Sequence, residues 1–181
     1  SDPYLLSSDQ DLQYLANSVN AGTSFSGKFF LQTADINLVE SQIFSDGFTP
    51  IGGFDGNRPF SGTYDGGGHS ISKMLINGVG KLAMFSNLQN GCVKNLNLEN
   101  VNFSANGASN ISGLVAVAGN STISNVTVSG QLSASGEMPE LYFAGMVGQA
   151  TRTSVSGSLC MFTVDVENAQ FNSSEVAGIA K

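Results

Sequence analysis

Three stretches of the chain follow one pattern: AMFSNLQNGCVKNLNL (83–98), GLVAVAGNSTISNVTV (113–128) and GMVGQATRTSVSGSLC (145–160). Each begins with a small residue and two apolar residues, and continues into a strand in which apolar and polar residues alternate. The starts lie 30 and 32 residues apart, and the match fades in the second half of the third copy. A unit of this size cannot bury an apolar face alone, whereas stacked units share one continuous core. The pattern therefore predicts a parallel β-solenoid.

Each repeat is expected to hold three short strands, the third being 101–104, 131–134 or 162–166. Stacking predicts apolar columns that point into the core, namely Leu96 over Val126 and Leu98 over Val128 over Cys160. Repeat lengths vary, and we expect projecting loops at 106–110, 136–140 and 168–174 to absorb the difference. A new start at Ala177-Gly178-Ile179 predicts that the repeats continue beyond Lys181.

The glycine-rich stretch Asp65-Gly66-Gly67-Gly68-His69 lies upstream of these copies. It lacks the Lys-Ser/Thr of a phosphate loop, and the residues after it alternate as a strand instead of starting a helix. We expect a tight turn, because consecutive glycines permit positive φ. The strand 70–76 after it is predicted to align with the strand that begins at Val93, 22 residues downstream of Ile71.

The N-terminal segment carries one helical pattern, over residues 8–20. Leu12, Leu15, Ala16 and Val19 form an i, i+3, i+4, i+7 stripe, with Ser7 or Ser8 as the N-cap and Gly22 at the exit. After Gly27 the period changes to two, which predicts strands with Leu31 and Thr33 on one face, followed by Ile36 and Leu38. We expect one domain over 1–181: a helical cap (1–24), lead-in strands and a first coil (25–82), and repeats (83–181).

A β-sandwich also has many short strands and is the competing architecture. Two observations favour the solenoid. The register is kept at Val93, Ile123 and Val155, and asparagine recurs at one repeat position, Asn95 and Asn125. We expect these two asparagines to hydrogen-bond along the stack as a ladder.

The composition excludes several kinds of partner. The net charge is −7 with seven basic residues in all, which excludes the positive surface that nucleic acids require. No window reaches the 18 or more apolar residues of a membrane span, and the first residues do not form a signal peptide. High glycine content with 12% charged residues is typical of secreted or surface all-β proteins.

The two cysteines, Cys92 and Cys160, are predicted to be free thiols. The repeat register places them two coils apart, near 10 Å at about 4.8 Å per coil, whereas a disulfide needs Cα atoms within about 7 Å. We expect Cys160 to be buried.

The stretch from Phe60 to Met74, preceded by Phe48-Thr49-Pro50-Ile51-Gly52, resembles the lead-in of surface proteins with GLUG-type repeats. Gly113-Leu114-Val115 followed by Ile123-Ser124-Asn125 resembles the repeat itself. The resemblance implies an adhesin-like right-handed parallel β-helix on an exported protein, particularly of gut bacteria. It also implies that the motif residues are structural and not catalytic. The chain departs from the pattern at Ala83 and Ser86, where glycines are usual.

Candidate binding residues are few. Asp46, Asp55 and Asp65 are candidate calcium ligands, because calcium requires only hard oxygen ligands. No zinc or nucleophilic constellation surrounds His69, and plain turns explain the acids equally well, so we predict no catalytic residue, no cofactor and no metal. For a ligand surface the candidates are Tyr64, His69, Glu137, Glu140, Tyr142 and Arg152.

We therefore expect a non-enzymatic stalk or adhesive module at the cell surface or outside the cell. Its expected partner is a host surface, a matrix component or a glycan, and neither nucleic acid nor membrane insertion is expected. Two alternatives stay open. A β-helix polysaccharide-degrading enzyme would need carboxylates converging on one face, and a targeting region of a larger surface peptidase would be identified by the full gene.

Overall fold

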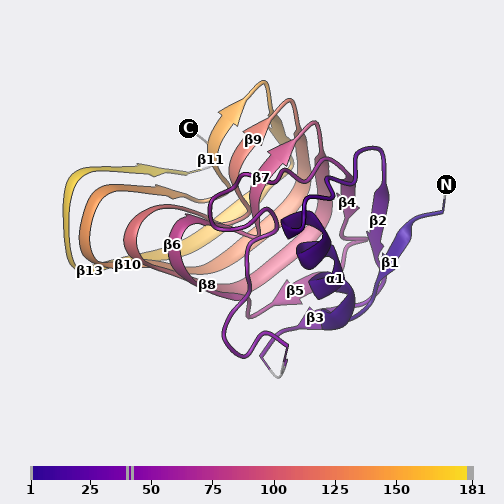
Figure 1. Ribbon diagram of the computed structural model, residues 1–181, viewed down its shortest axis with the longest axis horizontal. Helices are drawn as coiled ribbons and strands as arrows, with labels where there is room; N and C mark the ends of the chain where they lie inside the picture. The colour runs from indigo at the N-terminus through magenta and orange to yellow at the C-terminus, as the bar shows by residue number, and fades with distance from the viewer. Residues whose placement is uncertain (1, 40, 42, 179–181) are drawn as a thin grey trace.

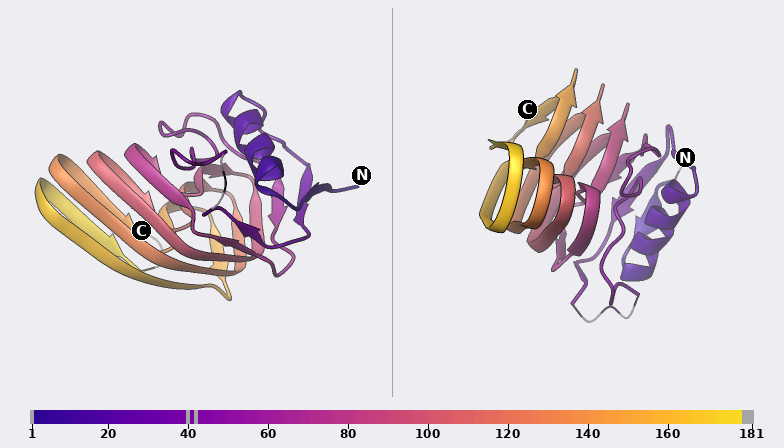
Figure 2. Two further views of the ribbon diagram at one scale, coloured as in Figure 1. Left: turned by 90° about the horizontal axis from the view of Figure 1, so that it is seen from below. Right: turned by 60° about the vertical axis from the view of Figure 1, so that its left-hand side comes forward.

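Parallel strands stack in about five turns of a β-solenoid, with one short helix at the N-terminal end (Figures 1 and 2). The computed structural model describes residues 2–39, 41 and 43–178. The predicted fold class, an all-β parallel solenoid with an N-terminal helix, is confirmed.

Two sheets form the walls of the solenoid. The larger contains ten strands, ordered β1-β2-β4-β8-β10-β12, with β3, β5, β6 and β13 paired alongside. Their bounds are β1 Tyr4–Leu6, β2 Phe29–Gln32, β3 Ile36–Asn37, β4 Thr63–Asp65, β5 Ser70–Ser72, β6 Leu75–Leu82, β8 Cys92–Ser112, β10 Thr122–Ala144, β12 Ser154–Ser156 and β13 Leu159–Ala177. The second sheet consists of β7 (Phe85–Gln89), β9 (Val115–Gly119) and β11 (Val147–Thr151).

Helix α1 spans Asp9–Asn20 and begins where the capping signal predicts. The hydroxyl of Ser8 accepts a hydrogen bond from the Asp11 amide, and the predicted apolar stripe is buried in the common core. The Asn20 side chain accepts a 2.7 Å bond from the amide of Gly52, which ties the helix to the first coil. Strand β1, which pairs in parallel with β2, was not predicted.

The repeat register is confirmed. Val93, Ile123 and Val155 align, as do Leu98, Val128 and Cys160. The last column extends upstream through Ile71 to Ile36, and its members from Ile36 to Val128 are buried. Aligned apolar side chains therefore form the continuous core that the repeat pattern implies.

The predicted alignment of the upstream coil is wrong. Tyr64, not Ile71, pairs with Val93, and Ile71 pairs with Leu98. The strand predicted at 70–76 is also interrupted, because Lys73 has φ 60° between β5 and β6. Alternation alone cannot distinguish these registers, since it fixes which face a residue occupies but not its partner.

The predicted phase of β2 is also wrong. Phe30 and Gln32 point inward with 0% and 1% exposure, whereas Leu31 is half-buried and Thr33 is exposed. The prediction followed Leu31 and therefore chose the opposite face, because a glutamine is rarely buried. Ile36 and Leu38 are buried, as predicted.

The predicted projecting loops are paired strand. Strands β8 and β10 continue through 106–110 and 136–140, and β13 through 168–174, each bending back (Figure 1). In the bends of β10 and β13 the two backbones pair with each other. The positions of the length differences are nevertheless those predicted. The differences lie between two aligned positions, which are Gly78 and Gly80 in β6. Val79 alone lies between them in β6, whereas the corresponding segments of β8, β10 and β13 are 106–108, 135–140 and 167–173. We call this region the bend; it lengthens toward β13.

Left-handed residues recur at the corners. Asn90, Asn120 and Arg152 follow the three strands of the second sheet with φ of 54°, 49° and 48°. Asn95, Asn125 and Gly157 form another such column, with φ of 52°, 54° and 58°. Asparagine tolerates this conformation better than most residues with a side chain, so its recurrence marks the corners.

Cys92 and Cys160 are both free thiols in the structure, as predicted. The expectation that Cys160 is buried is wrong, because it is only half-buried. It lies on β13, over which no further strand packs within the described part of the chain.

Candidate functional site

The glycine-rich stretch is a turn between β4 and β5, as predicted. The amide of Gly67 donates to Asp65 Oδ1 at 3.0 Å, and the amide of His69 donates to the Gly66 carbonyl at 2.9 Å. Gly67 and Gly68 have φ of 61° and 81°. A side chain at Gly66 would collide with the backbone carbonyl of Asn95, so this glycine lets two coils approach closely.

Asp65 links this turn to the next coil. Its carboxylate accepts a 3.0 Å bond from Asn95 Nδ2 and forms a 3.2 Å ion pair with Lys94 Nζ. Partial burial acts to raise the pKa of Asp65, but the Gly67 amide, the Asn95 amide group and Lys94 together hold this pKa below its usual value. Asn125 Nδ2 in turn donates to Asn95 Oδ1 at 3.3 Å, so the predicted asparagine ladder is confirmed and starts at Asp65.

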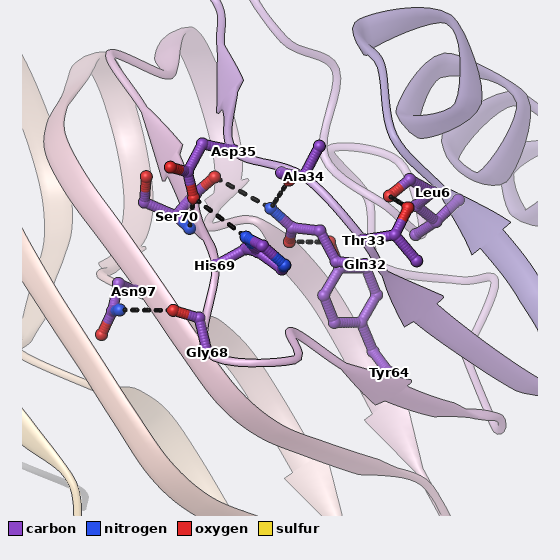
Figure 3. A network of polar contacts seen from close by, with 10 residues as sticks. All are labelled: Leu6, Gln32, Thr33, Ala34, Asp35, Tyr64, Gly68, His69, Ser70 and Asn97. Atoms are coloured by element: carbon purple, nitrogen blue, oxygen red, sulfur yellow. Dashed lines mark hydrogen bonds and ion pairs between the residues drawn. The ribbon is translucent and has the colours of Figure 1, made fainter.

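His69 lies beside Asp35, a partner that sequence reasoning missed. Asp35 Oδ1 is 3.3 Å from His69 Nδ1 and accepts a 2.8 Å bond from the Ser70 amide (Figure 3). The Ser70 amide is the largest cause that lowers the pKa of the exposed Asp35 carboxyl. The pairing of Ile36 with Ile71 puts Asp35 next to Ser70, so a correct register would have revealed it.

Tyr64 does not belong to a ligand surface. Its side chain is 0% exposed, and its hydroxyl donates a 2.9 Å bond to Gln32 Oε1 inside the core (Figure 3). Gln32 Nε2 donates to the carbonyls of Ala34 and Ser70 at 2.9 and 2.8 Å. Burial raises the pKa of Tyr64, so the phenol stays neutral. This network explains why Gln32 points inward: it satisfies polar atoms of three segments.

The three candidate calcium ligands do not share a site. Asp65 is paired with Lys94, and Asp55 binds the amide and the side chain of Asn57 at 3.1 and 2.9 Å. The Asn57 amide is also the largest cause that lowers the pKa of Asp55. Within the described residues no group of three or more His, Cys, Asp and Glu side chains converges. A calcium site there has no geometric support.

Two of the remaining candidates, Glu140 and Tyr142, lie together. They line a groove of about 250 Å³ with Gly80, Lys81, Ser109, Asn110 and Gln149. The ladder aligns Tyr142 with Asn110, and Asn110 with Lys81, across three coils. Glu137 is in β10 next to this groove in sequence, but its side chain lies outside the described part of the structure.

Arg152 is exposed at the left-handed corner that follows β11. It stands where the two preceding coils have Asn90 and Asn120. Tyr64 is buried, and neither Arg152 nor His69 lines the groove that holds Glu140 and Tyr142, so the six predicted ligand residues do not form one site.

A larger groove, of about 440 Å³, was missed by sequence reasoning. It crosses β6, β8, β10 and β13 and is lined by Leu75, Asn77, Asn102, Ser104, Gln131, Ser133, Ala134, Ser135 and Asp165. We call it the cross-coil groove. The ladder aligns Leu75 with Asn102 and Gln131, and Asn77 with Ser104, Ser133 and Asp165. The signal in the sequence was the recurrence of short polar residues at the outward positions of the third segment.

Comparison with known proteins shows a distant similarity. The chain is 32% identical to halomucin of Haloquadratum walsbyi (strain DSM 16790 / HBSQ001) over 160 residues, which are 85% of this chain but 2% of the length of that relative. No family model matches the chain. Among solved structures, it is similar to the crystal structure of "a putative immunoglobulin A1 protease" from Bacteroides ovatus, with a TM-score of 0.42 and 12% identity, over 99% of this chain and 84% of the other.

No helix among the described residues has the length and hydropathy needed to span a membrane.

Proposed function

We propose that this chain is a non-enzymatic module of a secreted or cell-surface protein, in which the solenoid displays a binding surface. The observation that carries the proposal is that the acidic side chains and the histidine around the glycine-rich turn hydrogen-bond to the scaffold itself. Asp65, His69 and Asp35 all hydrogen-bond in or between the turns of neighbouring coils. Their chemistry serves the scaffold, which leaves the outward ladders as the surface for recognition.

Two further observations support this proposal. The similarity to halomucin over most of the chain favours a location outside the cell. The low charge and the recurring Asn, Ser and Thr residues suit an exposed surface that binds through hydrogen bonds. We also propose that the module is adhesin-like, as its resemblance to proteins with GLUG-type repeats implies. Its proposed partner is a host glycan or a matrix component.

The experiment has two arms. In the source organism, an antibody against residues 1–181 should label intact cells or the culture medium, whereas signal only after lysis would contradict the proposed location. Purified protein should bind one member of a glycan and matrix-protein array. Turnover of any polysaccharide on that array would overturn the non-enzymatic assignment in favour of a β-helix carbohydrate-active enzyme.

A further inference from the structure

The cross-coil groove differs from the other polar ladders in one respect: five of its polar side chains have no hydrogen-bond partner among the residues that the structure describes. Asn95 and Asn125 bond along the stack, and Ser121 bonds to the carbonyls of Leu88 and Gly119. By contrast, none of the side chains of Asn77, Asn102, Ser104, Gln131 and Ser133 hydrogen-bonds to another described residue. Their donors and acceptors therefore face the groove and solvent.

We propose that the cross-coil groove binds a neutral oligosaccharide that lies across the coils. This proposal rests on the proposed surface-binding function and assigns its site and ligand class. Amide groups supply both donors and acceptors, and hydroxyl groups do the same, which matches the hydroxyl groups of a sugar chain. Leu75 and Ala134 add apolar contact beside them.

The charge of the groove selects a neutral ligand. Asp165 is the one ionisable residue among the described residues of its lining, and the chain carries a net charge of −7. The described lining residues include no arginine or lysine that could pair with a uronate or sulfate group. An acidic polysaccharide would therefore bring negative charge to a site that repels it.

The shape of the groove selects an extended ligand. It crosses four coils, a length of roughly 14 Å at about 4.8 Å between neighbouring strands. Equivalent polar groups recur at each coil, with Asn77, Ser104 and Ser133 in one row and Asn102 and Gln131 in the other. A chain of similar sugar units can meet similar partners at each step, so affinity should increase with oligosaccharide length until the groove is filled.

The test is calorimetric titration of the protein with neutral hexasaccharides of glucose, galactose and mannose, and with an oligogalacturonate as the acidic comparison. A double substitution, Asn102→Ala with Gln131→Ala, should lower the affinity for the bound neutral hexasaccharide about tenfold. Neither side chain has a partner within the described residues, so folding should be unaffected, which the circular dichroism spectrum and the melting temperature would check. The matched control is Gln149→Ala, an exposed glutamine that lines the groove at Glu140 and Tyr142 instead.

Each outcome separates this proposal from the proposed function. Loss of binding in the double variant with unchanged binding in Gln149→Ala supports the cross-coil groove. Equal binding by wild type and double variant overturns the groove assignment but leaves surface binding intact. Loss in Gln149→Ala alone moves the site to the other groove. Preference for the oligogalacturonate, or no binding to any of the neutral hexasaccharides, overturns the ligand class, while labelling of intact cells would still support the proposed location.

Discussion

Asn125 Nδ2 donates a hydrogen bond to Oδ1 of Asn95 one coil away, and both residues adopt left-handed backbone conformations. Each asparagine thus has two roles at its corner: its backbone turns the chain and its side chain joins neighbouring coils. The same ladder reaches Asp65 and through it the glycine turn.

Replacing Asn95 with alanine should lower the free energy of unfolding by about 2 kcal/mol, because a left-handed alanine costs roughly 1–2 kcal/mol and the ladder bonds are lost as well. Asn95→Gly removes only the bonds and should cost less. Urea denaturation measures both, with the exposed Asn102→Ala as the control. Equal costs for alanine and glycine would contradict the role of the backbone.

Arg152→Asn should stabilise the protein by about 0.5–1 kcal/mol. Arg152 occupies a left-handed corner with φ 48°, where the preceding coils have asparagine. Asparagine adopts this conformation with less backbone strain than arginine. Thermal unfolding would show a raised melting temperature for this variant, and Arg58→Asn, which has no positive φ in the structure, should not raise it. A stability decrease in Arg152→Asn would mean that the arginine makes a compensating interaction.

Gly67→Ala should destabilise the protein far more than Gly68→Ala. Both glycines have positive φ, so both substitutions introduce backbone strain of about 1–2 kcal/mol. A Cβ atom at Gly67 would also lie 2.6 Å from the Gln32 carbonyl oxygen, whereas one at Gly68 meets no atom within 4 Å. The difference between the two unfolding free energies therefore measures the close approach of the coils, and no difference would contradict it.

Gln32→Leu should cost more stability than Tyr64→Phe. Leucine leaves the buried Tyr64 hydroxyl without its acceptor, at about 1–3 kcal/mol, and also removes the part-buried bonds to the carbonyls of Ala34 and Ser70. Phenylalanine leaves only Gln32 Oε1 without its donor. In urea titrations the double variant should lose less stability than the sum of the losses in the two single variants, because both substitutions remove the same hydrogen bond, between Tyr64 and Gln32. Additive costs would indicate that the two side chains do not interact.

Stability should decline in acid, and Asp65 should contribute to the decline. The pKa of this carboxyl is lower in the folded protein than in the unfolded chain. Its ionised form therefore stabilises the fold above the unfolded value of about 4, and this contribution is lost as the pH falls through the folded value. Urea titrations from pH 6 to pH 3 should show a smaller decrease for Asp65→Asn than for the wild type. Parallel curves would rule out a contribution from Asp65.

The stacked core could be predicted from the sequence because repetition fixes register. Once Val93, Ile123 and Val155 are aligned, the inward columns and the asparagine ladder follow. Upstream of the repeats no second copy constrains the alignment. Ile71 was therefore paired with Val93 instead of Leu98, and the contact of His69 with Asp35 was missed as a result.

The candidate site was harder to predict than the fold. Tyr64 was assigned to a surface although burial is decided by which face of β4 meets the core. Leu31 and Thr33 were assigned to one face of their strand, but the buried face carries Phe30 and Gln32, and a polar residue such as Gln32 is rarely buried. Only the three-dimensional network explains both positions. The cross-coil groove also required the structure, since it depends on how adjacent coils bend.

The bends make each successive coil wider, while the ladders on the other walls stay aligned. Neighbouring coils keep the same alignment at the ladders, while the segment between two aligned positions grows from Val79 alone to residues 167–173. Figure 2 shows the coils extending further toward the C-terminal end. Ser135, the first residue of the longer bend of β10, already lines the cross-coil groove. Residues can therefore be inserted at the apex of a coil, changing the contour that a partner meets, without altering the alignment of any ladder on the remaining walls.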